Sequence, residues 1–210
     1  MIELPEAAGL AQQINEMFVR KRVSNVAAAH SPHKFAWFYG DPQDYYERLT
    51  GKVIGTASAY GGLVEMEAED SVLLFGDGVN LRFHGEKDKR PQKHQLLIDF
   101  EDGSSLSASV QMYGGLWCFK YGEFDNPYYQ MAKEKPSPLT DEFDYTYYDR
   151  LLSAPGTEKI SAKALLATEQ RIPGLGNGVL QDILYNAKIH PKRKVKTFTR
   201  EDKELLYHSL

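Results

Sequence analysis

The chain is organised around the stretch RIPGLGNGVLQDILYNAKIHP, which runs from Arg171 to Pro191. Its proline and first glycines end one helical pattern, and a second pattern with an apolar face begins at Gly178. Glycines in the turn let backbone N–H groups approach a ligand, and we expect Asn177 at the N-cap of the second helix. Unpaired N–H groups at a helix N-terminus attract anions, so a phosphate is the natural ligand. Spacing alone equally allows a plain packing corner between two helices, with Asn177 only a cap.

The residue sequence of this stretch resembles the helix–two-turn–helix of the formamidopyrimidine-DNA glycosylase / endonuclease VIII family. Members of that family carry a G-[IL]-G-N turn, then a helix, then an exit similar to G-I-H-P. This chain has GLGN at Gly174–Asn177 and KIHP at Lys188–Pro191. In that family the turn grips the DNA backbone. The resemblance therefore implies phosphate contacts, with two basic side chains as helpers, at Asn177, Gly174, Gly176, Gly178, Lys163 and Arg171.

The first six residues, MIELPE, are similar to the M-P-E-L-P-E opening of the same family. There the methionine is removed, and the proline amine attacks the sugar carbon that bears the damaged base, forming a Schiff base. An α-amino group titrates near neutrality, so a useful fraction is uncharged without special tuning. The resemblance assigns proton transfer to Glu3 and the holding of the terminus to Glu6. For both glutamates the alternative is a structural role, because carboxylates are favoured in the first turn of a helix.

Ile2 stands where the family has its proline. A bulky second residue normally blocks methionine removal, so the terminal amine belongs to Met1, displaced by roughly 3.5 Å from the family's position. Removal of Met1 would instead expose the primary amine of Ile2, which can also form a Schiff base. We therefore take Met1 and Ile2 together as the candidate nucleophile positions.

Composition bounds the class of protein. The 210 residues are 42% hydrophobic and 12% aromatic, enough for packed cores, and they contain no signal peptide or membrane-length apolar run. We expect a cytoplasmic monomer without membrane contact. The single cysteine, Cys118, lies in an apolar run and is expected in a core. The net charge of −4 is uneven: residues 150–210 hold 11 Lys/Arg against 6 Asp/Glu, which suits either a one-sided DNA contact or solvated helix faces.

The pattern before residue 134 predicts one helix, Leu4–Val19, followed by a short helix ending at Leu49 and many short strands. Short strands with tight turns favour a two-sheet β-sandwich. The expected strands are Val23–Ala29, Val53–Ala59, Leu63–Ala68, Ser71–Phe75, Val79–His84, His94–Phe100, Leu106–Tyr113 and Leu116–Tyr121.

After residue 134 the pattern becomes helical. Gly122–Pro138 has the character of a linker, and the following PLTDEF resembles the family's P-L-S-D-E-F helix entry. Thr199 and Asp202 approximate a capping box. The expected helices are Asp141–Ser153, Ser161–Arg171, Gly178–Ala187 and Thr199–His208. We predict an α+β fold with a sandwich domain over 1–133 and a helix–two-turn–helix domain over 134–210, shorter than its family counterpart and without the zinc hairpin.

Three loops that probe DNA in the family match poorly. The R-R-G-K-Y-L loop, whose lysine touches phosphate, is AYGGLV at Ala59–Val64, without a basic residue. The methionine of the L-G-M-x-G loop falls at Asp77, and the R-R-F-G wedge falls on Gln111–Gly114. Within that wedge, Tyr113 is either a residue that stacks between bases or a cross-strand aromatic. After the exit proline, Lys192 and Arg193 either contact the DNA backbone or belong to a solvated connector.

The resemblance implies a base-excision repair protein, namely a damaged-base DNA glycosylase with β-elimination lyase activity at abasic sites. Its partner would be duplex DNA containing oxidised bases or abasic sites. No cofactor or metal is implied, because the family's four-cysteine zinc hairpin is absent from these residues. Two alternatives stay open: a non-catalytic DNA-binding homologue that has lost the nucleophile, and a protein-interaction module on a reused fold.

Overall fold

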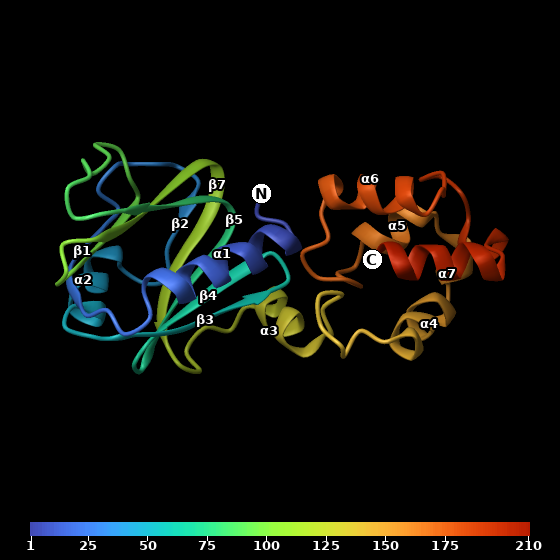
Figure 1. Cartoon of the computed structure of the whole chain (residues 1–210), viewed down its shortest axis with the longest axis horizontal. Coiled ribbons are helices and arrows are strands. Elements are labelled where there is room, and N and C mark those ends of the chain that lie inside the picture. Colours follow the sequence, from blue (N-terminus) through green and yellow to red (C-terminus); the bar gives the residue numbers. More distant parts are fainter.

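The computed structural model describes residues 1–210, in which a sheet with an N-terminal helix is followed by a helical region (Figure 1). This is the α+β arrangement that the sequence predicts. The elements in chain order are α1 (Leu4–Met17), β1 (Val23–Ala28), β2 (Ala36–Trp37), η1 (Pro42–Asp44), α2 (Tyr45–Leu49), β3 (Ile54–Tyr60), β4 (Leu63–Ala68), β5 (Ser71–His84), β6 (Leu96–Phe100), β7 (Ser105–Lys120), α3 (Pro127–Glu134), α4 (Tyr145–Ser153), η2 (Thr157–Lys159), α5 (Ala162–Ala167), α6 (Asn177–Asn186), η3 (Val195–Thr197) and α7 (Arg200–Ser209).

All seven strands belong to one sheet, with the order β1-β6-β7-β5-β4-β3 and the short β2 beside β7. Neighbours pair antiparallel except β2 and β7, which are parallel. β5 and β7 have 14 and 16 residues and pair along almost their whole length. The prediction of two separate sheets is therefore corrected. Hydrogen bonding continues through one sheet, which bends across β5 and β7.

The bend lies where glycines of the two long strands face each other. Gly76 pairs with Gly115 and Asp77 with Gly114, and the register slips between Asp77 and Val79. Asp77 has a left-handed φ of 59°, as expected for the extra residue of a bulge. Glycine and aspartate are typical turn residues, so the sequence predicts chain reversals here. Because the two segments pair with each other across the sheet, they form a bulge instead of two turns. The expected strands Ser71–Phe75 and Val79–His84 are therefore one bent strand, β5, and Leu106–Tyr113 and Leu116–Tyr121 are largely one bent strand, β7.

The bent sheet encloses the main core. Twenty-five buried residues from both halves of the sheet, from α2 and from the inner face of α1 form one apolar cluster. Cys118 lies within it, as predicted, and burial raises the pKa of its thiol to about 12. A smaller cluster of five buried residues involves β4, β5, β7 and α3, namely Leu63, Val72, Leu74, Phe119 and Tyr129.

The segment Gly122–Pro138, expected as a linker, contains helix α3. The Asn126 side chain caps it by accepting the Tyr129 N–H at 3.0 Å, and a proline occupies its first turn. The Lys133 ammonium lies 3.1 Å from the Glu65 carboxylate, which is only 3% exposed. Eight residues give too little periodicity to predict a helix, and the anchoring contacts come from the distant β4.

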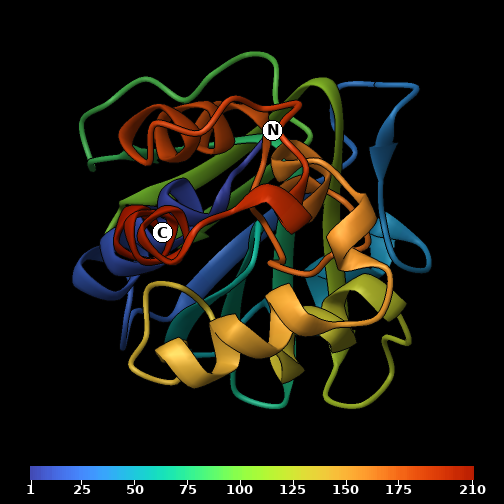
Figure 2. The same cartoon turned by 90° about the vertical axis from the view of Figure 1, so that its right-hand side faces the viewer.

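The helical region has its own core of 17 buried residues drawn mainly from α4 to α7, to which α1 contributes Leu4. Figure 2 shows these C-terminal helices, coloured orange to red, in front of the sheet. Helix α5 ends at Ala167, four residues earlier than predicted, because Glu169 and Gln170 adopt left-handed φ values of 58° and 48°. No helix in the chain is both long enough and apolar enough to span a membrane.

Helix α7 begins with the predicted capping box between Thr199 and Asp202. Arg193 extends this cap, because its guanidinium donates to the two Asp202 carboxylate oxygens at 2.8 and 2.5 Å. The Arg193 hydrogen bonds lower the pKa of Asp202 to about 2, from an ordinary value of 3.8. A carboxylate with a lowered pKa in the folded state stabilises the fold at pH values above its unfolded pKa.

We predict that Arg193→Met lowers the free energy of unfolding by about 1 kcal/mol near neutral pH, a figure that allows for solvent screening of this pair. The difference from the unmodified chain should shrink as the pH falls from 3.8 towards 2, because Asp202 becomes protonated. Denaturant unfolding at a series of pH values measures this. Arg200→Met, which removes an exposed pair with Glu204, is the control and should change little. A pH-independent difference would contradict the assignment.

Candidate functional site

The first residues of the chain meet the turn before α6. The Glu3 carboxylate accepts the N–H of Gly178 at 3.0 Å and the N–H of Val179 at 2.8 Å. These are the donors that an N-cap side chain normally satisfies, and the N-cap residue here is Gly176, which has none. Asn177 was expected at the N-cap and is instead the first helical residue. Two amides that the sequence assigns to a phosphate are therefore occupied by a carboxylate of the same chain.

Backbone contacts join the same segments. The Leu4 N–H donates to the Gly174 carbonyl at 2.8 Å. A Cβ on Gly174, whose φ is 78°, would lie 2.2 Å from the Gly61 carbonyl carbon, and a Cβ on Gly62 would lie 2.7 Å from the Ile2 oxygen. Only glycine fits such approaches. The N-terminus, the β3–β4 turn and the turn before α6 thus pack together through their main chains.

The terminal residues divide into buried and exposed positions. Ile2 is 7% exposed, and its N–H donates to the Asp77 carbonyl at 2.5 Å. Met1 is 64% exposed, and its amine takes part in no hydrogen bond within the chain. Glu6 accepts the Glu3 N–H at 2.9 Å, so its observed contact is the structural one expected in a first helical turn. Of the four candidate catalytic residues, Met1 alone presents a free reactive group.

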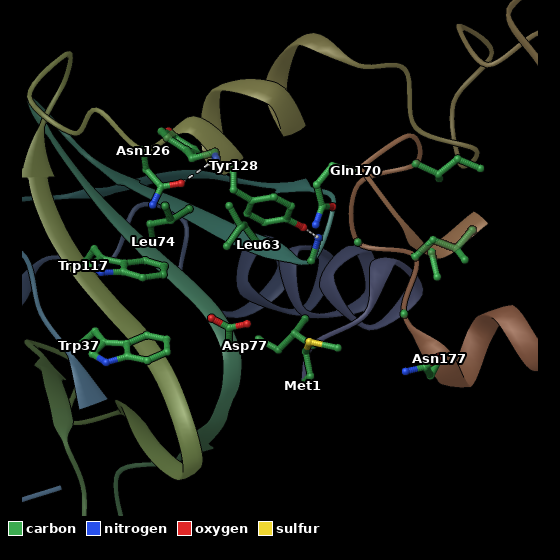
Figure 3. Close-up of a pocket in the computed structure, with 18 of the residues that line it drawn as sticks. Met1, Trp37, Leu63, Leu74, Asp77, Trp117, Asn126, Tyr128, Gln170 and Asn177 are labelled. Atoms are coloured by element: carbon green, nitrogen blue, oxygen red, sulfur yellow. Dashed lines mark hydrogen bonds between the residues drawn. The ribbon is translucent and has the colours of Figure 1, made fainter. Parts of the chain in front are cut away.

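A cavity of about 510 Å³ opens beside Met1, between the sheet and the turn before α6 (Figure 3). Met1, Ile2, Gly174, Gly176 and Asn177 line it, and Asn177 is exposed. The structure thus brings the predicted N-terminal and turn residues to one place. The rest of the wall includes five aromatic side chains, those of Trp37, Trp117, Phe124, Tyr128 and Tyr129.

The electrostatics of the cavity differ from those of a phosphate site. No lysine, arginine or histidine lines it, and Gly62 occupies the wall where the resembled loop carries its lysine. The one acidic lining residue is Asp77. Partial burial raises the pKa of its carboxyl, and the Met1 amine opposes this rise. The cavity is therefore suited to an uncharged or donor-bearing group rather than to an anion.

The remaining predicted residues lie outside this cavity. Arg171 donates to the carbonyls of Ala164 and Thr168 at 3.2 Å and pairs with Glu169 at 2.6 Å, so it closes the end of α5. Arg193 is held by Asp202, as described above. Lys163 and Lys192 are exposed, and their ammonium groups have no partner in the chain. The Gly178 N–H is used by Glu3, as described above.

Tyr113 is 38% exposed, and its ring centroid lies 5.7 Å from that of Trp37 on β2. This is the cross-strand aromatic contact that the sequence left as one of two alternatives. The sequence analysis did not single out the cavity residues Trp37 and Trp117. One signal was available: they are the chain's only two tryptophans. The pairing of β2 with β7, which brings them together, has no local signature.

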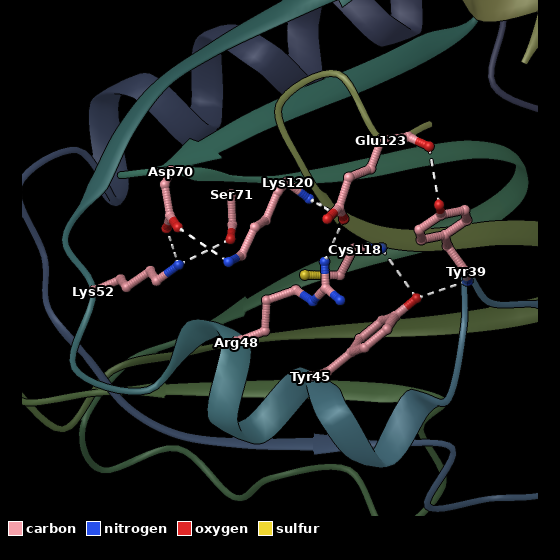
Figure 4. Close-up of polar contacts among 9 residues, drawn as sticks. All are labelled: Tyr39, Tyr45, Arg48, Lys52, Asp70, Ser71, Cys118, Lys120 and Glu123. Atoms are coloured by element: carbon pink, nitrogen blue, oxygen red, sulfur yellow. Dashed lines mark hydrogen bonds and ion pairs between the residues drawn. The ribbon is translucent and has the colours of Figure 1, made fainter. Parts of the chain in front are cut away.

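One buried hydroxyl, that of Tyr45, fixes the loop that follows β2 (Figure 4). The Tyr45 hydroxyl accepts the N–H of Tyr39 at 2.9 Å and of Cys118 at 3.0 Å, and it donates to the Leu116 carbonyl at 2.9 Å. Burial raises the pKa of Tyr45 to about 12. Tyr45 therefore ties the loop after β2 to the backbone of β7 on either side of Trp117.

Comparison with known proteins places these observations in context. Residues 1–136 match the family model of the formamidopyrimidine-DNA glycosylase N-terminal domain. A protein of that name from Lactococcus lactis subsp. cremoris is 28% identical over 217 residues, spanning 100% of this chain and 76% of the relative. One from Streptococcus pneumoniae is 24% identical, spanning 96% and 72%.

Solved structures share the fold across both parts of the chain. A crystal structure of the Lactococcus lactis Fpg with DNA containing an abasic site has a TM-score of 0.79 and 24% sequence identity, covering 99% of this chain and 76% of that one. A complex of the same enzyme with DNA containing FAPY-dG gives the same TM-score and identity. The likeness extends through the helical region, beyond the residues that the family model matches.

We predict that Tyr45→Phe lowers the free energy of unfolding by about 2 to 4 kcal/mol, because it leaves two N–H groups and one carbonyl without a partner. Thermal or denaturant unfolding measures the loss. Tyr46→Phe is the matched control, since Tyr46 is 50% exposed and its side-chain hydroxyl makes no hydrogen bond. Equal stability of the two variants would show that the buried hydroxyl does not fix this loop.

Gly176→Ala tests the contact between Glu3 and α6. Gly176 has a φ of −91°, which alanine tolerates, but its Cβ would lie 2.5 Å from the Glu3 carboxyl carbon. We expect a loss of about 1 to 3 kcal/mol and faster hydrogen exchange at the Gly178 and Val179 amides. Gly9→Ala, on α1 with open space around it, should be neutral or stabilising. Unchanged exchange at both amides would contradict the capping role.

Proposed function

The chain belongs to the formamidopyrimidine-DNA glycosylase family, and from this premise we propose that it is a DNA base-excision repair protein that acts on damaged or abasic duplex DNA. The observation that carries the proposal is the position of the Met1 amine. It is exposed, it makes no hydrogen bond within the chain, and it lies beside a cavity at the junction of the N-terminus with the α6 turn.

The proposed chemistry is that of a terminal amine. In its uncharged form the amine of residue 1 attacks C1′ of the damaged nucleotide, and the base leaves as the new C–N bond forms. The opened sugar is then held as a Schiff base, from which loss of the 2′ proton expels the 3′ phosphate and cleaves the strand. Glu3 is the proposed proton carrier, and it would exchange one of its two amide hydrogen bonds for this role.

DNA would lie across the junction between the two parts of the chain. In this proposal α5, the turn and α6 form the helix–two-turn–helix, and residues 1–133 and 134–210 are the two domains that flank the duplex. Asn177 contacts a phosphate from the exposed side of the turn. The exposed ammonium groups of Lys163 and Lys192 supply further backbone contacts.

A second candidate, a DNA-binding homologue without catalysis, is favoured by two observations. Ile2 replaces the family's proline, and its buried N–H is committed to the Asp77 carbonyl. Gly62 also stands in the place of the lysine of the family's R-R-G-K-Y-L loop, which removes a cation beside the DNA strand. Asp77 stands in the place of the methionine of the L-G-M-x-G loop, which adds an anion there. This candidate shares the DNA-binding surface with the first and differs only in chemistry.

Borohydride trapping on an abasic duplex separates the two candidates. We expect a covalent adduct that peptide mapping places at the terminal amine, with the intact mass identifying residue 1. Asn177→Ala should weaken DNA binding, and Lys192→Gln should reduce the slope of log affinity against log salt by about one. Lys87→Gln, in the charged loop between β5 and β6, is the control and should leave the slope unchanged.

The negative outcomes are equally distinct. Salt-sensitive binding without an adduct, with Met1 retained, would favour the non-catalytic homologue. Binding that neither Asn177→Ala nor Lys192→Gln alters would contradict the proposed DNA contact as a whole.

A further inference from the structure

Met1 and Asp77 lie together where two cavities meet. Both residues line the cavity beside the α6 turn, and both line a second cavity of about 590 Å³ between α1, β5 and β7. The Ile2 N–H donates to the Asp77 carbonyl, which brings residue 1 against the sheet bulge. In Figure 3 the Asp77 carboxylate lies next to Met1. The fold therefore places the terminal amine beside one particular carboxylate.

Few other charged groups surround this pair. No Lys, Arg or His side chain lines either cavity, so the terminal amine is the only cationic group among the lining residues. Glu6 on α1 accepts the Glu3 N–H, and burial raises the pKa values of the two α3 tyrosines, which stay neutral. The other ionisable side chains that line the two cavities are Glu6, Tyr113, Tyr128 and Tyr129. Asp77 is thus the free carboxylate beside the amine.

The position of Asp77 is set by its backbone. Its left-handed φ of 59° belongs to the bulge between β5 and β7, and its half-buried carboxylate makes no hydrogen bond or ion pair within the chain. Partial burial raises the pKa of this carboxyl above its ordinary 3.8, which brings it closer to the range in which a group both takes and returns protons. In contrast, both Glu3 oxygens are engaged by α6 amides.

We propose that Asp77 exchanges protons with the terminal amine and so supplies the proton transfers that Schiff-base formation requires. This inference rests on the proposed function, in which that amine is the nucleophile. The two groups make no direct ion pair in the structure. Met1 is exposed, however, and a carboxylate that reaches an amine through one water exchanges protons with it. Glu3 keeps its proposed role at the sugar oxygen.

The Asp77 carboxylate first takes one proton from the ammonium form of residue 1. The freed nitrogen lone pair forms the bond to C1′ of the abasic sugar, and a proton passes from that nitrogen to the C1′ oxygen. The protonated Asp77 then gives its proton to the C1′ hydroxyl as the C–O bond breaks, so that water leaves and the protonated Schiff base remains. Asp77 ends the step ionised, as it began, and no further reactant is consumed.

A carboxylate beside an amine can also act by its charge alone. It would then stabilise the ammonium form and lower the fraction of nucleophilic amine. The two roles predict opposite effects of Asp77→Asn, because loss of a proton carrier slows the reaction and loss of a mere counter-charge speeds it. Asparagine tolerates a left-handed backbone and keeps the carbonyl that Ile2 contacts, so the variant should fold, which circular dichroism checks.

Reductive trapping of the full chain with glycolaldehyde and sodium cyanoborohydride measures the amine without DNA. Peptide mapping by mass spectrometry separates modification of residue 1 from that of lysine side chains, which serve as internal controls. At pH 6 we expect Asp77→Asn to react about 100-fold more slowly at residue 1, the low end of what a positioned acid–base group contributes. Asp141→Asn, an exposed acid elsewhere, should react like the unmodified chain.

The pH profile separates a proton carrier from a structural residue. In the unmodified chain the pair shares one proton from about pH 5 to about pH 7, so the rate should be nearly constant there. In Asp77→Asn the rate should rise about tenfold per pH unit over this range and approach that of the unmodified chain in alkaline solution, where the amine is uncharged. A faster reaction of Asp77→Asn at pH 6, or two parallel profiles, would overturn the proposal.

Trapping on an abasic duplex relates the pair to repair. Slower adduct formation by Asp77→Asn, with DNA affinity not reduced, supports both the repair function and the role of Asp77. If the unmodified chain forms no DNA adduct while its reaction with glycolaldehyde depends on Asp77, the repair chemistry fails and the proton exchange stands. If both chains form the DNA adduct equally fast, the role of Asp77 fails and the repair function stands.

Discussion

The structure depends on a carboxylate at one end of the chain that caps a helix near the other end. Glu3 satisfies two amides at the start of α6, and the adjacent Leu4 N–H binds the Gly174 carbonyl. Each charge-assisted hydrogen bond of this kind contributes on the order of 1 to 3 kcal/mol. The contact joins the N-terminus to α6 beside the cavity, and the Glu3 carboxylate leaves no room for a side chain at Gly176.

Local signals predicted much of the fold. Apolar periodicity located α1, α6 and α7, and the Thr199–Asp202 pair identified a cap that the structure contains. The family resemblance, carried by the turn and the opening residues, is confirmed by the match over residues 1–136. Local signals failed where the structural role of a residue depends on a partner far away in the sequence. Gly76 and Gly115 resemble turn residues until they are paired across a sheet, and Glu3 resembles an ordinary first-turn carboxylate until α6 lies beside it.

The candidate site was only half predictable for the same reason. The sequence indicated Met1, Glu3 and Asn177, and the structure places them around one junction. The sequence could not indicate that Arg171 and Arg193 form ion pairs within the chain, because their partners, Glu169 and Asp202, depend on how the helices end and are capped. Nor could it indicate the aromatic cavity. Where the resembled family presents a cation to the strand, this chain presents glycine, indoles and an unpartnered carboxylate, and its chemistry must be understood from those groups.

The contact between Glu3 and Gly178 also has a consequence for biosynthesis. The two residues are 175 positions apart. While the chain is being made, the start of α1 waits without its partner until nearly the whole polypeptide has left the ribosome. The sheet can assemble earlier, because its strands all precede residue 121. The junction that carries the terminal amine is therefore among the last parts to form, and contacts of such long separation close slowly. A nascent chain with a complete sheet still lacks this candidate site.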